Sequence, residues 1–169
     1  MKRSILFILF PLILSSCVGL GTSKFTPVKY YDLGRPQADK LKLNISSINL
    51  EGATKTRMLK RVKSESVEVD EYNRWTQAPD SLMTHYLKMA FIPGGDVELS
   101  GEILAFENDL TTDKAVLVFH YELSNENKLI YKGVFHSQQE SSGSADTFAK
   151  AMAKAASELR QHISQRLKR

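Results

Sequence analysis

Hydrophobic and polar residues alternate along four stretches of the chain, as they do in strands with one buried face. In the first stretch, residues 41–50, the alternation is regular until its parity shifts at Ser46-Ser47. A β-bulge and a break between two strands each explain this shift. The other three stretches span residues 97–103, 115–123 and 129–135. The turn-forming Asn125-Glu126-Asn127 separates the last two, so the sequence predicts an antiparallel three-strand meander.

Shorter segments predict the remaining strands. Tyr30–Leu33 is a brief β-prone segment that ends at Gly34-Arg35-Pro36. Residues 57–62 and 66–72 predict a polar hairpin around Lys63-Ser64-Glu65.

Two segments have the spacing of helices. The first begins at Pro79-Asp80-Ser81, where proline suits the first turn and the aspartate favours the positive end of the helix dipole. Its apolar stripe consists of Leu82, Met83, Tyr86, Met89 and Ala90. The second begins at Asp146, after the loop Ser141–Ser144. Its stripe advances by three or four residues a step through Phe148, Met152, Ala155, Leu159, Ile163 and Leu167.

The order of these elements predicts the fold class. Strands come first, followed by one helix, the three-strand meander and a long C-terminal helix. This order favours an α+β domain, a two-layer sandwich of a mostly antiparallel sheet with two helices packed on one face. A chain of 169 residues suits a single domain, which we place at residues 30–169.

The N-terminus has the pattern of a secretory signal. A basic Met1-Lys2-Arg3 precedes the apolar run Ile5–Leu14, which is too short to span a membrane. Leu14-Ser15-Ser16-Cys17 then resembles a bacterial lipobox. We therefore expect a signal peptide at residues 1–16 and a lipidated tether at 17–29. An ordinary cleavage site beside a free thiol is the alternative interpretation of Cys17.

The resemblance to a lipobox predicts a mature protein that is anchored at a membrane. In the lipoprotein pathway, the thiol of Cys17 receives a diacylglyceryl group and its freed amine is often acylated, and two or three chains give stable anchoring. Position 18 is valine. In lipoproteins of diderm bacteria an aspartate there commonly signals retention in the inner membrane, so we expect anchoring at the periplasmic face of the outer membrane.

Charge adds little to this prediction. The chain has 23 basic and 19 acidic residues, and removal of Lys2 and Arg3 leaves 21 against 19, a mature charge of +2. The basic residues are scattered, apart from the C-terminal Arg166, Lys168 and Arg169. We predict no nucleic-acid partner.

The sequence lacks the common motifs of catalytic and cofactor sites. It contains no phosphate-binding loop, no HExxH and no GxSxG. The four histidines, at positions 85, 120, 136 and 162, lack the spacing of metal ligands. If the last two strands pair around Glu126, His120 lies opposite position 132 or 133 rather than opposite His136. We therefore expect no catalytic residue, no metal, no cofactor and no enzyme.

One segment combines residue types that are common in interfaces. Arg74 and Trp75, the only tryptophan, lie between the predicted hairpin and the first helix. Trp75 either completes the core where a strand leads into the helix, or contacts a partner together with Arg74.

Several of these segments, in the same order, resemble the PqiC (YmbA-like) family of ABC-type transport auxiliary lipoproteins. The resemblance rests on short motifs: Cys17, Tyr30–Leu33, Met58–Arg61, Asn73–Trp75, Pro79–Leu82, Leu99–Ile103, Phe106-Glu107 and the closing helix. It covers nearly the whole mature chain. Thr76-Gln77 departs from the Ala-Glu that often follows the tryptophan in the family, so no acidic side chain there can be assigned a role.

The resemblance implies a non-enzymatic lipoprotein that docks an MCE-domain protein, which spans the periplasm from the inner membrane and conducts lipids. Several copies of such a docking protein can form a ring, so a homo-oligomer is one arrangement that the resemblance implies. Two alternatives from other classes remain. A pilotin-like assembly lipoprotein would serve another outer-membrane complex, and a lipid carrier would need its own cavity, for which two layers of this size leave little room.

Overall fold

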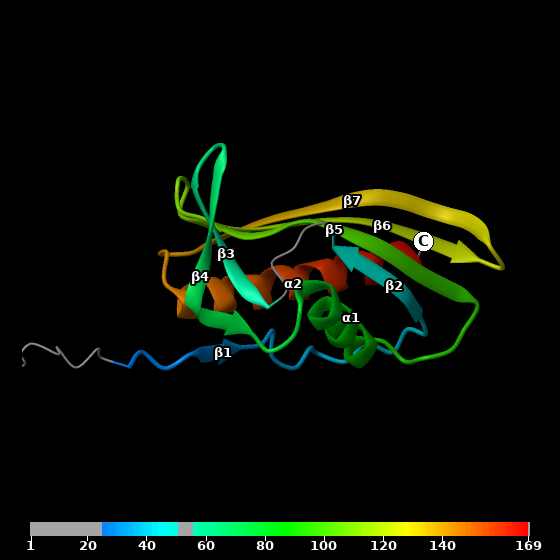
Figure 1. Cartoon of the computed structure of the whole chain (residues 1–169). Coiled ribbons are helices and arrows are strands. Elements are labelled where there is room, and N and C mark those ends of the chain that lie inside the picture. The colour runs from blue at the N-terminus through cyan, green and yellow to red at the C-terminus, as the bar shows by residue number, and fades with distance from the viewer. Residues whose placement is uncertain (1–24, 51–55, 169) are drawn as a thin grey trace, which may run out of the picture.

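The computed structural model describes residues 25–50 and 56–168 and shows a sheet with two helices (Figure 1). Cys17, the predicted signal peptide and most of the predicted tether lie outside these residues. The elements are β1 (Lys29–Tyr31), β2 (Asn44–Leu50), β3 (Arg57–Lys63), β4 (Ser66–Trp75), α1 (Pro79–Ala90), β5 (Val97–Asp109), β6 (Lys114–Asn125), β7 (Lys128–Glu140) and α2 (Ala145–Leu167). This architecture confirms the predicted α+β fold.

The sheet has the strand order β1-β4-β3-β5-β6-β7, with β2 also paired to β5. The long ladders β5–β6 and β6–β7 and the hairpin β3–β4 are antiparallel, as the sequence predicts. Three further pairings, β1–β4, β2–β5 and β3–β5, are parallel. Alternation along a strand shows which face is buried but not the direction of its neighbour, so these three pairings could not be predicted.

The shift of parity in residues 41–50 is a bulge within one strand. The register of β2 on β5 changes between Ile45 and Ile48, and both side chains remain buried. The hydroxyl of Ser46, inside the bulge, donates to the backbone carbonyl of Leu99 at 3.1 Å. Of the two explanations for the pattern, the bulge is therefore the one the structure supports.

Helix α1 begins at Pro79 as predicted, and its apolar stripe differs from the prediction at one residue. Leu82, Met83, Tyr86 and Ala90 are buried, whereas Met89 is 41% exposed. Leu87 is buried in its place. At 100° per residue, the buried residues span an arc from Leu82 to Leu87, and Met89 lies just outside that arc, beyond Leu82.

Helix α2 forms most of the second layer. Ser144 caps its N-terminus, where the serine hydroxyl accepts a hydrogen bond from the backbone N–H of Thr147. The predicted stripe from Phe148 to Ile163 is fully buried, and Leu167 packs against the core as a partly buried residue. Fully buried Ala155 and Ala156 let the helix lie close to the sheet.

Candidate interaction surface

The two faces of the sheet have different surroundings. On one face α2 packs against β6 and β7, and α1 packs against β2 and α2 (Figure 1). Within residues 25–50 and 56–168, no helix packs on the opposite face. We call this second face the open face. A sheet with one open face normally presents polar side chains to water.

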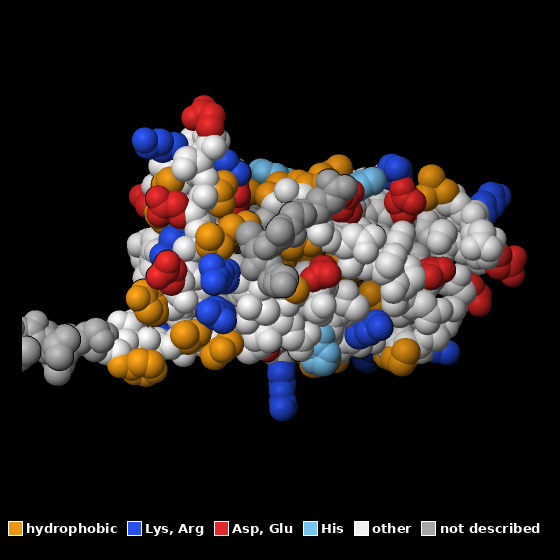
Figure 2. All heavy atoms as spheres, viewed as in Figure 1, with side chains coloured by type: hydrophobic (Ala, Val, Ile, Leu, Met, Phe, Trp, Pro, Cys, Tyr) orange, Lys and Arg blue, Asp and Glu red, His pale blue; other side chains and the backbone are white. Residues whose placement is uncertain are grey.

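Several aliphatic side chains on the open face depart from that rule. Leu104 of β5 is 54% exposed and Val134 of β7 is 59% exposed. Between them, half-buried Val118 of β6 lies on the same face, since it pairs with Ala105 and His136. Figure 2 shows apolar side chains along the upper side of the molecule, over β5 to β7. These residues form an apolar strip across three strands.

A bulge in β5 adds Leu104 to this strip. The pairing with β6 shifts between Ile103 and Ala105, so β5 contains one extra residue at this point. Ile103 and Phe106 on either side both remain in the core. The extra residue therefore presents a leucine to solvent without removing an apolar side chain from the core.

The hairpin of β3 and β4 extends the open face. Val67 and Val69 of β4 are 42% and 43% exposed, and they pair with Arg61 and Leu59 of β3. Arg61 binds Glu107 of β5 through two hydrogen bonds of 2.7 and 2.9 Å. This bidentate ion pair fixes the hairpin to the central strand where β3 and β5 share only two paired positions.

The structure places Trp75 in the core. Its side chain is 0% exposed, and its ring packs edge-to-face on Phe106 and Phe148, with centroids 5.2 and 5.4 Å apart. Of the two interpretations left open by the sequence, this burial supports the core interpretation for Trp75. Arg74 is half-buried and lies on the other side of β4, so the two predicted interface residues do not share a surface.

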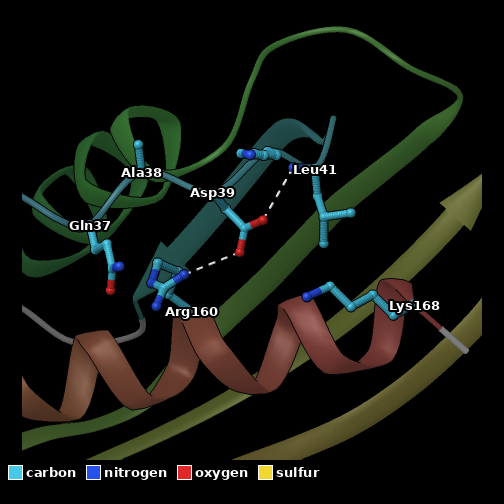
Figure 3. Close-up of a pocket in the computed structure, with 7 residues that line it drawn as sticks. Gln37, Ala38, Asp39, Leu41, Arg160 and Lys168 are labelled. Carbon is cyan, nitrogen blue, oxygen red and sulfur yellow. Dashed lines mark hydrogen bonds and ion pairs between the residues drawn. The ribbon is translucent and has the colours of Figure 1, made fainter.

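A polar region separate from the open face joins the segment before β2 to α2. A cavity of about 420 Å³ is lined by Asp39, Arg160, Lys168 and their neighbours (Figure 3). The Asp39 carboxylate accepts hydrogen bonds from Arg160 Nη1 at 3.1 Å and from Ser164 Oγ at 2.5 Å. The Ser164 hydrogen bond is the main cause that lowers the pKa of Asp39, and burial opposes it.

These contacts hold the segment before β2 against α2. Asp39 is separated from Arg160 by 121 positions, so no sequence spacing could have indicated the pair. Arg160 is 7% exposed, and a charge buried to that extent requires a partner. The pair fastens the long connection between β1 and β2 to the helical layer.

The two histidines of the meander, His120 and His136, are not paired directly with each other in the sheet. His120 pairs with Val134, and His136 pairs with Val118. The predicted partner of His120, position 132 or 133, was wrong: the irregularity between Leu123 and Ser124 skips Ile130 and shifts the register by one residue. In the described part of the chain, no group of three or more His, Cys, Asp or Glu side chains could hold a metal ion. None of its helices is long and apolar enough to cross a membrane.

Comparison with known proteins supports the fold. No protein-family model and no curated protein matches the sequence. One solved structure, of an uncharacterized protein, is 15% identical with a TM-score of 0.73, over 83% of this chain and 99% of that one. Protein XCC0632 from Xanthomonas campestris, of family DUF330, is 16% identical with a TM-score of 0.63, over 82% and 90%.

A third solved structure is more distant. The PelC dodecamer from Paraburkholderia phytofirmans is 12% identical with a TM-score of 0.38, over 73% of this chain and 92% of that one. The first two similarities show the fold alone: this chain folds like the uncharacterized protein and like XCC0632 of family DUF330.

Proposed function

We propose that this protein is a non-enzymatic lipoprotein, anchored through Cys17 to the periplasmic face of the outer membrane, that docks an MCE-domain protein of an ABC-type lipid transport system. The observation that carries a docking role is the apolar strip of Leu104, Val118 and Val134 on the open face. Exposed aliphatic residues grouped on one face are typical of protein–protein contacts.

The open face suits a protein partner better than a small ligand. It crosses neighbouring strands, and no helix of the described residues packs on it, so a partner can approach it broadly. Its apolar centre has polar neighbours, including Glu102 and His120, which pair with each other and lie beside Val134. An apolar centre within a polar rim is the usual composition of a protein interface. The MCE-domain identity of the partner comes from the resemblance in the sequence.

Site-specific crosslinking tests the proposal. A photoreactive amino acid replaces Leu104 or Val134 in cells that produce the full chain. Met89 provides a matched control, because it is also an exposed apolar residue but lies on α1. We expect crosslinks from positions 104 and 134 to an MCE-domain protein, and none to that protein from position 89.

Each other outcome points to a different role. A crosslink from the open face to a secretion or pilus component would replace the transport role with that of a pilotin-like assembly lipoprotein. Crosslinks only between copies of this chain would make the open face a homo-oligomer interface. Equal crosslinking from positions 89, 104 and 134 would show that the strip has no special role.

A further inference from the structure

A second surface lies at the end of the sheet where the chain emerges from its tether. Tyr30 of β1 pairs with Arg74 of β4, and Arg74 pairs with Arg57 of β3. Residues opposite one another in a sheet present their side chains on the same face. One aromatic and two guanidinium side chains therefore stand in a row across three strands, which we call the arginine row.

The arginine row contains an unfavourable pair. Two like charges directly opposite one another destabilise a sheet unless an anion lies between or beside them. Neither Arg57 nor Arg74 forms an ion pair with a carboxylate in the described part of the chain. The Nε of Arg74 is also buried without a hydrogen-bond partner there. Within residues 25–50 and 56–168, no carboxylate balances the charges of Arg57 and Arg74, so an external anion would stabilise the row.

Apolar side chains flank the two arginines. Tyr30 is 62% exposed, and Val28 just before β1 and Tyr72 of β4 are 38% and 46% exposed. Figure 2 shows basic side chains beside apolar ones at this end of the molecule, over β1 and the adjoining strands. Exposed tyrosines next to arginines are suited to the headgroup region of a bilayer, where the ring enters the apolar boundary and the cation meets phosphate.

The tether limits how far this surface can move from a membrane. Cys17 precedes Phe25, the first residue that the structure describes, by eight positions. Fully extended, eight residues span roughly 26–29 Å. If Cys17 carries acyl chains, β1 is the part of the described fold closest along the chain to the bilayer.

We propose that the arginine row binds the anionic phospholipid surface of the membrane that anchors the protein, so that Arg57, Arg74 and Tyr30 orient the domain on the bilayer. This inference rests on the acylation of Cys17 in the proposed function. The strip around Leu104 and Val134 belongs to other strands and remains available to a partner.

The contact between the two arginines and the bilayer is expected to be weak, so it can orient the domain only if the protein is tethered. A basic residue close to an anionic bilayer favours binding roughly fivefold, so two arginines favour it about thirtyfold. That factor is too small to keep a free protein on a membrane. For a tethered protein the contact is intramolecular, at an effective concentration in the millimolar range, and thirtyfold is sufficient to fix an orientation.

Chemical labelling of the acylated full-length chain in vesicles tests the proposal. Phenylglyoxal modifies accessible arginines, and tetranitromethane modifies accessible tyrosines. Vesicles of phosphatidylcholine are compared with vesicles that contain phosphatidylglycerol as the anionic lipid. We expect labelling of Arg57, Arg74 and Tyr30 to become about tenfold slower on the anionic vesicles. Labelling of Arg166, at the far end of α2, should not change, and it serves as an internal reference.

Two double variants separate specific contact from general charge. Arg57→Gln with Arg74→Gln should return the labelling of Tyr30 on anionic vesicles to within twofold of the neutral level. Lys128→Gln with Lys150→Gln removes the same charge from exposed positions elsewhere, and it should leave Tyr30 protected. Protection that survives loss of both arginines would overturn the proposal, because the charges would then not be its cause.

The remaining outcomes also decide the question. Equal labelling on both kinds of vesicle would overturn the proposal, and so would protection that appears only at raised protein concentration, which would indicate a second copy on this surface. A mass spectrum that shows Cys17 unmodified would remove the tether on which the proposal depends. Failure of the crosslinking at positions 104 and 134 would overturn the docking role while leaving this labelling pattern unchanged.

Discussion

The strands β5, β6 and β7 present one face to the helices and the other to solvent, and apolar residues occur on both. On the covered face, Leu99 of β5 is 0% exposed, and Phe119 of β6 is also fully buried. Only five positions after Leu99, Leu104 is more than half exposed. The folding of the domain accounts for the first leucine but not for the second, because an exposed side chain gains little from the fold. The comparison separates residues that stabilise the fold from residues that are free to bind a partner.

The largest expected effect lies on the covered face. Trp75→Ala should lower the free energy of unfolding by about 3–5 kcal/mol, because it removes a fully buried ring and leaves a cavity between Phe106 and Phe148. Urea unfolding measures this change. Trp75→Phe is the control, since it keeps an aromatic ring and should lose much less. If Trp75→Ala left stability unchanged while abolishing partner crosslinks, Trp75 would belong to an interface after all.

A second prediction concerns Asp70, a carboxylate that is 6% exposed where the β3–β4 hairpin leaves the rest of the sheet. Burial by itself would raise the pKa of Asp70. Hydrogen bonds from Lys60 and Asn73, together with those from the backbone N–H groups of Tyr72 and Asn73, outweigh burial and hold the pKa at about 2. The irregular pairing near this position leaves those backbone groups free to bind the carboxylate.

The sign of the pH dependence follows from this lowered pKa. Because the pKa of Asp70 is below its ordinary value of 3.8, the unfolded state binds the proton more readily than the folded state. The ionised carboxylate therefore contributes about 2 kcal/mol of stability above pH 4, and this contribution is lost as the pH falls toward 2. Asp70→Asn should remove it at pH 7. Urea unfolding of both proteins from pH 7 to pH 2 should show their difference in stability shrinking as the pH falls, and a constant difference would contradict the prediction.

The sequence pattern predicted the covered face more successfully than the open face. Period-two alternation located β5, β6 and β7, and the stripe of α2 was correct from Phe148 to Ile163, because burial directly constrains residue type. The outward positions carry no such constraint, so Leu104 and Val134 did not stand out. The sequence also did not indicate that Leu104 is exposed, because the bulge at this position interrupts the alternation of buried and exposed residues.

Long-range pairing limited the rest of the prediction. The row of Tyr30, Arg74 and Arg57 depends on a parallel pairing of β1 with β4, which joins residues 44 positions apart. The residue type of Arg74 and its position next to Trp75 indicated a candidate interface residue. Its neighbours in the sheet, which give it a candidate role, come only from the register of strands that are distant in the sequence.

The smallest expected effect on stability tests the open face directly. Leu104→Ser should change the free energy of unfolding by no more than about 0.5 kcal/mol, because its side chain is already largely in water. Leu99→Ala on the same strand is the matched control, and it should cost about 2–5 kcal/mol. Urea unfolding measures both variants under the same conditions.

Leu104→Ser and Leu99→Ala should differ in binding as well as in stability. Leu104→Ser should lose the crosslink from position 134 to the partner while retaining a normal unfolding curve, because the strip is continuous across β5, β6 and β7. A variant that unfolds easily loses binding for a trivial reason, as we expect for Leu99→Ala. A large loss of stability in Leu104→Ser would mean that the open face is covered within the protein itself, and its apolar strip would then be part of the fold and not a docking surface.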